Sequence, residues 1–283
     1  MKHSLRTTLR AGALLATLSL AAPTALAQEA AAQGAVAQAL PTAREIVDRF
    51  ATVSKLRETL EKTRSMHAKG TLSIPALGIQ GKLETWSAKP SQNRMSMDMG
   101  PAGTMVAGCD GEVAWMTHPL MGTRLLSGAE LLQSRVEASW FAALKQGEAY
   151  ESLRTVGRES FEGKECWKIE VVTRPLPGMD AEATRESRTT HEYYEVESGL
   201  LRGAKSRMDG ELGNVASTTV HAEYRELGGR LLATRTIVRQ TGQEIVLVVD
   251  SVEVDTLGPE AFVPPPEVQA LLAPAAPAKK PPQ

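Results

Sequence analysis

The sequence has few of the residues from which catalytic and metal sites are usually built. It contains two cysteines and five histidines, and neither residue type shows the spacing of a metal-ligand set. It has no Gly-x-Ser-x-Gly turn of a serine hydrolase and no His-Glu-x-x-His of a zinc protease. The carboxylates are scattered over the polar positions of strand-like segments. We therefore predict no catalytic residue, no metal and no cofactor, and a binding protein is favoured over an enzyme.

Aromatic residues, long apolar runs and basic runs are scarce as well. Aromatics make up 4% of the chain, so a core or a pocket must rely on Leu, Val, Ile and Met. The net charge is −1 and no long basic run is present, which makes nucleic acid an unsuitable partner. No apolar run reaches the roughly 20 residues that a membrane-spanning helix needs.

The N-terminus has the three parts of a secretory signal. Lys2, Arg6 and Arg10 form a basic start, an apolar stretch covers residues 11–22, and Ala25-Leu26-Ala27 is a small-x-small cleavage site. We predict a signal peptide over residues 1–27 that is cleaved after Ala27. The next residue is Gln28 rather than Cys, so no lipid anchor is expected there, and the mature protein should be exported and soluble, in the periplasm.

The two cysteines, Cys109 and Cys166, each lie beside a predicted hairpin turn. In an oxidising compartment they could form a disulfide, provided that their α-carbons lie within ~7 Å of each other. The alternative is two buried, unpaired thiols. The sequence leaves both possibilities open.

After the signal peptide and a leader, the mature chain is predicted to form a helix first and then mainly strands. Residues 28–41 are predicted to be a flexible leader, and residues 42–63 a helix that begins with a Thr42/Glu45 capping box. A second helix is predicted over residues 128–145. The segment 175–188 lacks any periodicity and is predicted to be a mobile loop, and the Pro- and Ala-rich residues 267–283 a disordered tail.

Elsewhere apolar and polar residues alternate with a period of two, which is typical of half-buried strands. Such segments cover residues 79–86, 94–99, 105–109, 113–116, 154–161, 166–173, 191–196, 201–208, 217–227, 231–241 and 244–255. Many of them are separated by tight turns such as Asp110-Gly111. About ten short strands joined in this way predict one antiparallel, strongly curved sheet.

Three motifs, in this order along the chain, resemble the LolA family of periplasmic lipoprotein carriers and the related LolB-like and outer-membrane lipoprotein-sorting proteins. Trp86-Ser-Ala-Lys89-Pro90 looks like the family's strand end with Trp-x-x-basic-Pro. Cys109-Asp110-Gly111-Glu-Val-Ala-Trp115-Met-Thr-His-Pro119 looks like its Asp-Gly-x-x-x-Trp-x-x-x-Pro hairpin. Ala261-Phe262-Val-Pro264-Pro265 looks like its terminal Phe-x-x-Pro segment, shortened by one residue.

The resemblance implies a mainly β fold with some α structure: an incomplete, half-open β-barrel of strongly curved antiparallel strands, with helices covering its concave face. It implies a single domain over residues 42–266 that takes up the acyl chains of lipoproteins or other lipids between a membrane-bound donor and an acceptor. Separately from the resemblance, we expect a monomer. Lys89 stands where the carrier has an arginine that holds the lid closed. Lys89 is thus the lid-latch candidate, although lysine cannot make the planar fork of an arginine.

Methionines mark the candidate lipid-binding surface. Met95, Met97 and Met99 project from one face of a predicted strand, and Leu83 lies on a neighbouring strand. Methionine is unbranched and polarizable and therefore adapts to acyl chains of variable shape. The alternative is that these residues form an ordinary core beneath the first helix. Trp115, beside the hairpin turn, is either a rim residue of the same cavity or a packed core residue.

Three classes of function remain after this reasoning, and the least favoured is an enzyme or an enzyme-associated module. The first is a carrier of lipids or lipoproteins toward the outer membrane. The second is a non-enzymatic envelope sensor or regulator on the same fold, which binds lipid or a partner protein. A carrier must release its cargo, whereas a sensor must hold one partner stably, and no second domain that would serve a sensor is evident in the sequence.

Overall fold

A computed structural model of the chain describes residues 40–145, 149–210 and 213–272. The predicted signal peptide, nearly all of the predicted leader and residues 273–283 of the predicted tail lie outside the described residues.

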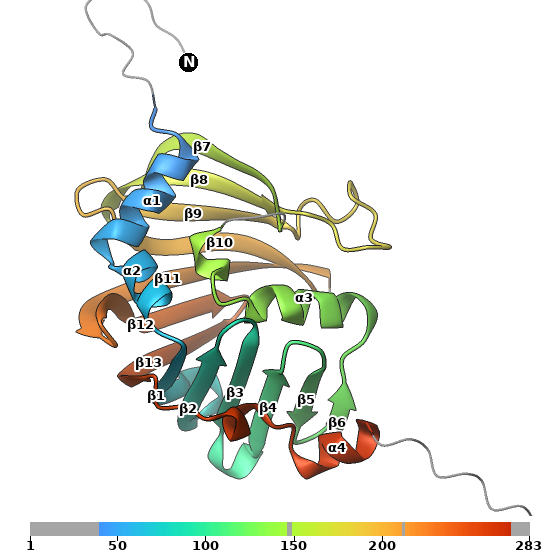
Figure 1. Ribbon diagram of the computed structural model, residues 1–283. Helices are drawn as coiled ribbons and strands as arrows, with labels where there is room; N and C mark the ends of the chain where they lie inside the picture. The colour runs from blue at the N-terminus through green and yellow to red at the C-terminus, as the bar shows by residue number, and fades with distance from the viewer. Residues whose placement is uncertain (1–39, 146–148, 211–212, 273–283) are drawn as a thin grey trace, which may run out of the picture. The chain divides into compact units, whose positions relative to one another are not determined.

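Among the described residues, thirteen strands form one antiparallel sheet (Figure 1). In spatial order they are β6 (Gly122–Leu125), β5 (Ala114–His118), β4 (Thr104–Cys109), β3 (Gln92–Asp98), β2 (Ile79–Ala88), β1 (Ser65–Ile74), β13 (Gln243–Val254), β12 (Arg230–Gln240), β11 (Gly213–Leu227), β10 (Leu201–Gly210), β9 (Thr189–Glu195), β8 (Lys164–Thr173) and β7 (Tyr150–Phe161).

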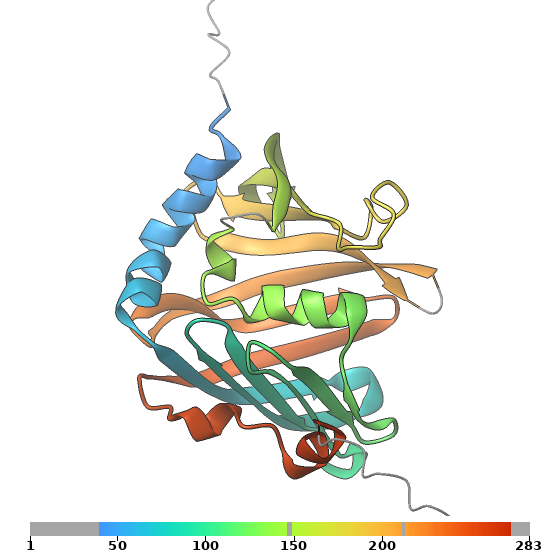
Figure 2. The same cartoon turned by 45° about the vertical axis from the view of Figure 1, so that its right-hand side comes forward.

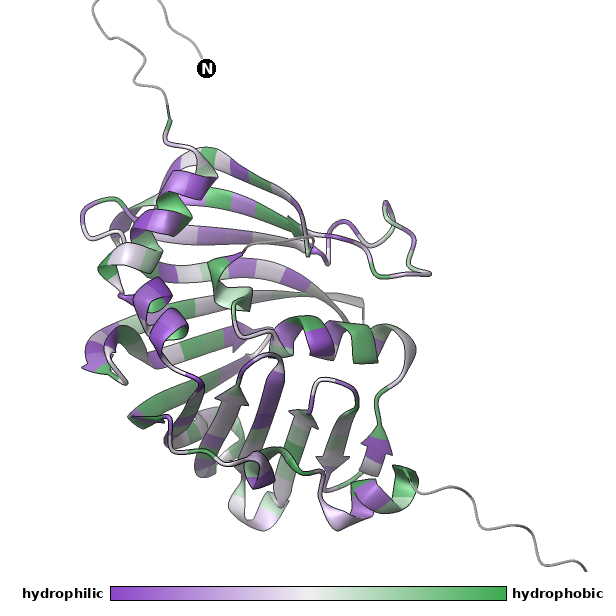
Figure 3. Ribbon diagram, viewed as in Figure 1, coloured by the Kyte–Doolittle hydropathy of each residue, from purple (hydrophilic) through white to green (hydrophobic). Residues whose placement is uncertain are grey.

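Most neighbours in this sheet are also neighbours along the chain, and β1 pairs with β13 to join the two halves. The edge strands β6 and β7 do not pair with each other, so the curved sheet is not closed. Alternating hydrophobic and hydrophilic residues along the strands give the sheet two distinct faces (Figure 3). The predicted fold class, a mainly β half-barrel with helices on its concave face, is confirmed.

Three helices cover one face of the sheet, which we call the inner face (Figures 1 and 2). They are α1 (Ala43–Val53), α2 (Leu56–Lys62) and α3 (Gly128–Ala138), and α3 is followed by the short 3₁₀ helix η3 (Ala142–Leu144). After β13 the chain continues into η4 (Pro259–Phe262), which packs against β3, and α4 (Pro266–Leu272), which packs against β6. Two further 3₁₀ turns, η1 (Pro75–Leu77) and η2 (Gly100–Ala102), connect strands.

The predicted capping box at the start of α1 is present. The Thr42 hydroxyl accepts a hydrogen bond from the Glu45 amide at 3.2 Å, and the Glu45 carboxylate accepts one from the Thr42 amide at 2.7 Å. The prediction of one helix over residues 42–63 is wrong, because Lys55 adopts a left-handed backbone conformation (φ 56°) and separates α1 from α2. The Ser54 hydroxyl donates back to the Phe50 carbonyl, which satisfies the end of α1.

The second helix is also shorter than predicted. It was expected to run over residues 128–145, but α3 ends at Ala138. The Trp140 amide donates to the Pro90 carbonyl at 3.1 Å, and the Trp140 indole donates to the Leu60 carbonyl at 2.8 Å. These two bonds draw the chain toward α2 and the end of β2, which a continuous helix could not reach.

Four clusters of buried side chains hold the described part of the chain together. The first lies between α1 and the strands β8 and β9, with the side chains of Ala43, Ile46, Val47, Ile169, Val171 and Tyr194. The second lies beneath α2 and η3, with those of Ala51, Leu56, Leu60, Met66, Trp140 and Leu144. The third contains Phe161, Cys166, Tyr193 and Val220, and the fourth Cys109, Ala114 and Ala138.

Two segments expected to be loose have defined contacts. The loop over residues 175–188 contains no helix or strand, as predicted, but it is organised around the buried guanidinium of Arg188. That group donates to the Glu151 carboxylate at 3.0 Å, to the Ala181 carbonyl at 2.6 Å and to the Thr173 carbonyl. The tail predicted from residue 267 is helical as far as Leu272, and Val268 in α4 is fully buried.

The disulfide considered between Cys109 and Cys166 is absent, because both thiols are free and buried. Cys109 ends β4 and Cys166 lies in β8, near opposite ends of the sheet, and the two side chains belong to different clusters. Burial raises the pKa of the Cys166 thiol to about 11. The structure therefore matches the alternative of two buried, unpaired thiols.

Candidate functional site

The predicted methionine face lies on the inner side of β2–β5. Ala114 packs with Ala138 of α3, so Met116, two residues further along β5, shares this inner face. Met116 lies opposite Ala107, and Ala107 opposite Met95. Directly opposed residues of an antiparallel pair point to the same face. We define the inner apolar surface as the set of side chains on this face of β2–β5: Leu83, Met95, Met97, Met105, Ala107 and Met116.

The side chains of the inner apolar surface are half-buried, and none of them belongs to the four buried clusters. Helix α3 crosses this side of the sheet (Figure 2). It packs against β4 and β5, yet of its residues only Ala138 is buried. The surface is thus covered loosely, by a helix that contributes little to the buried core. Met99 lies just beyond the end of β3, at the start of the turn into η2, and is not part of the surface.

Trp115 does not belong to this surface. It follows the inner-facing Ala114 along β5 and therefore points to the opposite, outer face. It is 0% exposed, so it is a packed residue rather than a rim residue. Gly108, opposite Trp115 on β4, makes room for the indole: a β-carbon at position 108 would lie 2.5 Å from Cζ2 of Trp115.

Lys89 lies where the end of β2 meets the helices. Its ammonium donates to the Glu61 carbonyl in α2 at 3.1 Å. It also lies over the Trp140 ring at 5.8 Å and the Phe141 ring at 5.7 Å, just after α3. The Lys89 side chain therefore contributes one hydrogen bond to a carbonyl and two cation–π contacts between this strand end and the helical cover.

The planar arginine fork that Lys89 cannot make is present elsewhere, in two copies on α1. Arg44 donates to the carbonyls of Leu144 at 3.2 Å and Lys145 at 2.7 Å, which ties α1 to η3. Arg49 donates to the carbonyls of Val196 at 2.8 Å and Glu197 at 2.7 Å, which ties α1 to the turn after β9. The sequence reasoning missed both residues, because their carbonyl partners lie about a hundred or more positions away and carry no side-chain signature.

Beneath η3 the inner face is polar and its charges are paired. Lys145 and Glu192 form a nearly buried ion pair at 3.3 Å, and the Tyr194 hydroxyl donates to Glu192 at 2.7 Å. Burial raises the pKa of Tyr194 far above its usual value, and Glu192 raises it further. Burial lowers the pKa of the nearby His221, which keeps that imidazole neutral near pH 7. The acid, base and hydroxyls of this cluster thus satisfy one another.

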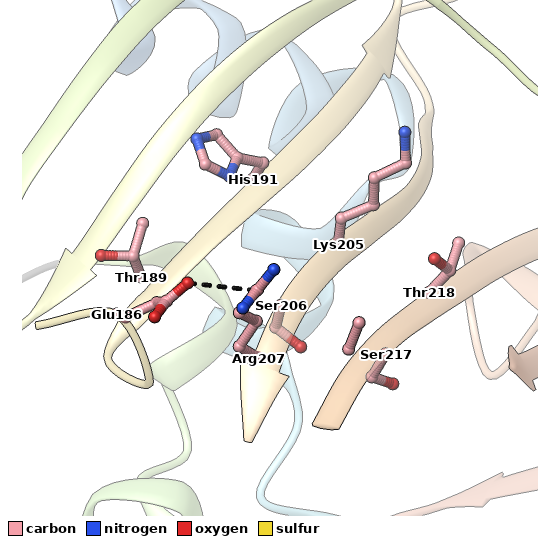
Figure 4. Close-up of a pocket in the computed structure, with 9 residues that line it drawn as sticks. Glu186, Thr189, His191, Lys205, Ser206, Arg207, Ser217 and Thr218 are labelled. Carbon is pink, nitrogen blue, oxygen red and sulfur yellow. Dashed lines mark ion pairs between the residues drawn. The ribbon is translucent and has the colours of Figure 1, made fainter. Parts of the chain in front are cut away.

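A groove on the outer side of β9–β11 has a volume of about 290 Å³, and nearly all of the residues that line it are polar or charged (Figure 4). Its basic side chains are all paired with acids. Arg207 lies 3.1 Å from Glu186, Lys205 lies 3.5 Å from Glu159, and His191 lies 3.6 Å from Glu170. A charge-balanced groove of this kind suits an acyl chain much less well than the methionine-rich surface does.

Two further properties bear on the kind of site. Among residues 40–145, 149–210 and 213–272, no three His, Cys, Asp or Glu side chains are grouped so that they could hold a metal ion. No helix of the described part of the chain is long and apolar enough to cross a bilayer.

The curved, open sheet with helices across its inner face is a half-barrel, and its fold is LolA-like. The chain resembles a LolA superfamily protein from Nitrosomonas europaea, with a TM-score of 0.54 and 13% identity over 80% of this chain and 99% of the other. It also resembles a candidate outer membrane lipoprotein-sorting domain from Vibrio parahaemolyticus, with a TM-score of 0.52 and 10% identity over 77% and 97% of the two chains.

A DUF1329 family protein from Desulfovibrio piger is similar to the same extent, with a TM-score of 0.52 and 13% identity over 78% of this chain and 96% of the other. No protein-family model and no curated protein sequence matches the chain. At these identities the likeness establishes the fold. The LolA-like resemblance predicted from the three motifs is therefore confirmed as a resemblance of fold.

Proposed function

We propose that this protein is an exported, non-enzymatic carrier that binds the acyl chains of lipoproteins or other lipids and moves them through the periplasm toward the outer membrane. The inner apolar surface carries this proposal. It presents four methionines and a leucine that are neither buried in a core cluster nor fully exposed. The similarity to a LolA superfamily protein and to a candidate lipoprotein-sorting domain supports it.

Methionine side chains suit this task, because each has three rotatable bonds and can repack around chains of different length. Met97 lies opposite Leu83 on one side and Met105 on the other, so the apolar strip is continuous across β2, β3 and β4. Burying it against an acyl chain would contribute about 25 cal/mol for each Å² removed from water. A bound chain would thus complete a core that the protein alone leaves half-covered.

Helix α3 is the element that would move to admit a lipid. Polar contacts hold both of its ends: Arg124 pairs with Glu130 at 2.6 Å near the start, and Arg135 donates to the Glu112 carbonyl. Exposed ion pairs of this kind contribute only about 0–1 kcal/mol each. Lys89 and the Arg44 fork then hold the segment that follows α3. We propose that these contacts together act as the latch, rather than Lys89 alone.

The test is native mass spectrometry of the protein purified from a periplasmic extract, with and without an added dipalmitoylated lipopeptide. The expected result is an intact mass that corresponds to cleavage after Ala27, with bound lipid or lipopeptide. Met97→Asp should reduce lipopeptide binding at least tenfold, because it places a carboxylate in the middle of the apolar strip.

The matched control is Met121→Asp, which makes the same change at a residue in the β5–β6 turn that is 68% exposed. It should bind lipopeptide like the unchanged protein. Circular dichroism and thermal unfolding show whether both variants are folded. If the folded, unchanged protein binds neither lipid nor lipopeptide, the carrier proposal is wrong.

A further inference from the structure

A second cavity lies on the inner face, beneath the end of α1 and away from the inner apolar surface. It has a volume of about 160 Å³ and opens between α1 and the strands β10–β12. Most of its wall is apolar, and the main apolar contributors are Phe50, Leu201, Leu231 and Leu232. The Leu231 amide donates to the Ser54 carbonyl at 3.0 Å, so the end of α1 and the start of β12 form a fixed wall.

Arg230 lies in this wall and its charge has no counter-ion. Within the described ranges, no hydrogen bond, ion pair or ring contact involves its guanidinium, and the residue is half-buried. The other shielded arginines of this half of the sheet are paired: Arg188 with Glu151 and Arg202 with Glu195. Burial lowers the pKa of Arg230, and no carboxylate near it counters this effect. A cation that is partly withdrawn from water and has no counter-ion is stabilised when an anion accompanies it.

The other polar groups of the cavity do not supply that anion. The Tyr224 hydroxyl donates to the Leu201 carbonyl, and burial raises the pKa of Tyr224 well above its usual value, so it stays protonated. His221 Nδ1 lies 3.2 Å from the Thr236 hydroxyl, and burial lowers the pKa of His221 so that it stays neutral. The cavity therefore combines one unpaired positive charge with neutral polar groups and an apolar wall.

We propose that this cavity binds the anionic head of a single-chain amphiphile, a carboxylate or a phosphate ester on an alkyl chain. Arg230 donates to the anionic oxygens, because a guanidinium carries five N–H donors and matches such groups in its plane. Phe50 and Leu232 contact the first carbons of the chain. A volume of about 160 Å³ holds only the head and these carbons, so the rest of the chain lies outside the cavity.

This inference does not depend on lipid binding at the inner apolar surface, because the two sites share no residue. It adds a selectivity that the methionines cannot provide. A purely apolar surface binds an alcohol and a carboxylate of equal chain length through the same carbons. Arg230, in contrast, pairs with the carboxylate but not with the alcohol, so the cavity should bind the carboxylate more tightly.

The experiment compares decanoate, decanol and inorganic phosphate by isothermal titration calorimetry on the mature protein. Decanoate is expected to bind at least about tenfold more tightly than decanol, which is the usual contribution of a hydrogen bond to a charged group. Phosphate, which lacks an alkyl chain, is expected to bind much more weakly than decanoate. Equal affinities for decanoate and decanol overturn the proposal without the need for any variant.

Arg230→Met then removes the charge and keeps a similar apolar volume. It should abolish the preference for decanoate over decanol, and Arg230→Lys should keep part of it. The control is Arg225→Met, which removes one positive charge at a side chain that is 68% exposed, and it should keep the full preference. Retention of the preference in Arg230→Met overturns the proposal, and phosphate binding as tight as that of decanoate shows a site for free anions instead.

The carrier proposal and the head-group cavity can be refuted independently of each other. Met97→Asp should leave the preference for decanoate unchanged, and Arg230→Met should leave the binding of a neutral dipalmitoylated lipopeptide unchanged. If Met97→Asp removes the decanoate preference, the two surfaces form one site and the assignment of a separate head-group cavity is wrong.

Discussion

The Arg44 fork gives a quantitative prediction about the helical cover. Arg44 extends from α1 and donates to two consecutive carbonyls, those of Leu144 at 3.2 Å and Lys145 at 2.7 Å. These carbonyls end η3, the turn that follows the proposed mobile helix α3. Arg44→Met keeps the unbranched apolar part of the side chain and removes all of its donors, so it tests the hydrogen bonds rather than the packing.

The expected effect is local and of moderate size. A hydrogen bond to a charged group contributes about 1.5–3 kcal/mol when it is well shielded. Arg44 is half-buried and water can reach the freed carbonyls, so we expect the two bonds together to contribute about 1–2 kcal/mol. A loss of this size raises the equilibrium constant for opening of η3 by a factor of about 5–30.

Hydrogen–deuterium exchange measures this opening directly. The amides of Leu144 and Lys145 donate to the carbonyls of Phe141 and Ala142, so they are protected while η3 is formed. In Arg44→Met their exchange should accelerate by about 5–30-fold, while amides of the central strands β12 and β13 keep their rates. The control is Arg57→Met on α2, whose guanidinium pairs with Asp48 at 2.8 Å and does not reach η3. If exchange at Leu144 changes by less than twofold, the fork does not hold the cover closed.

Two further predictions concern the buried ionisable groups. Burial alone would raise the pKa of Glu195, but hydrogen bonds from Ser198 and Arg202 outweigh it and lower the pKa from 4.5 to about 2. This stabilisation, on the order of 2–3 kcal/mol, is present above about pH 4.5 and is lost as the pH falls toward 2. Glu195→Gln should therefore be less stable at pH 7, and its chemical denaturation should depend less on pH below 4.5. Iodoacetamide at pH 8 should label neither Cys109 nor Cys166 in the folded protein and both in urea, whereas a disulfide found in the unreduced, denatured protein would contradict the two free thiols.

The sequence predicted those features that depend on residues close together in the chain. Alternation along residues 94–99 predicted a methionine face, and Met95 and Met97 lie on the inner side of β3, whereas Met99 lies beyond the end of the strand. The Thr42–Glu45 spacing identified the start of α1, because a capping box spans only four residues. The Asp110-Gly111 turn was likewise predicted, and the Asp110 carboxylate accepts from the amide of Val113 at 2.8 Å.

Features that depend on distant partners could not be predicted from one sequence. The face to which Trp115 points follows from the packing of Ala114 on α3, which only the tertiary structure shows. The break between α1 and α2 at Lys55 leaves no Gly or Pro as a signal. Strand β1 was missed because Gly70 interrupts its pattern. Only glycine fits at position 70, because the backbones of β1 and β13 lie close together there. A β-carbon at this position would lie 1.9 Å from the Val248 carbonyl oxygen of β13.

The distribution of buried side chains explains how the inner apolar surface can remain available to a ligand. Tyr194 packs beneath α1, so the adjacent Tyr193 points to the outer face, where its ring stacks on that of Phe161 at 4.3 Å. Trp115 is likewise buried on the outer face of the other half of the sheet. Both faces thus contribute to stability, and the inner apolar surface is not needed as a closed core. A carrier requires this separation, because a surface that must release its cargo cannot also be the main source of its folding free energy.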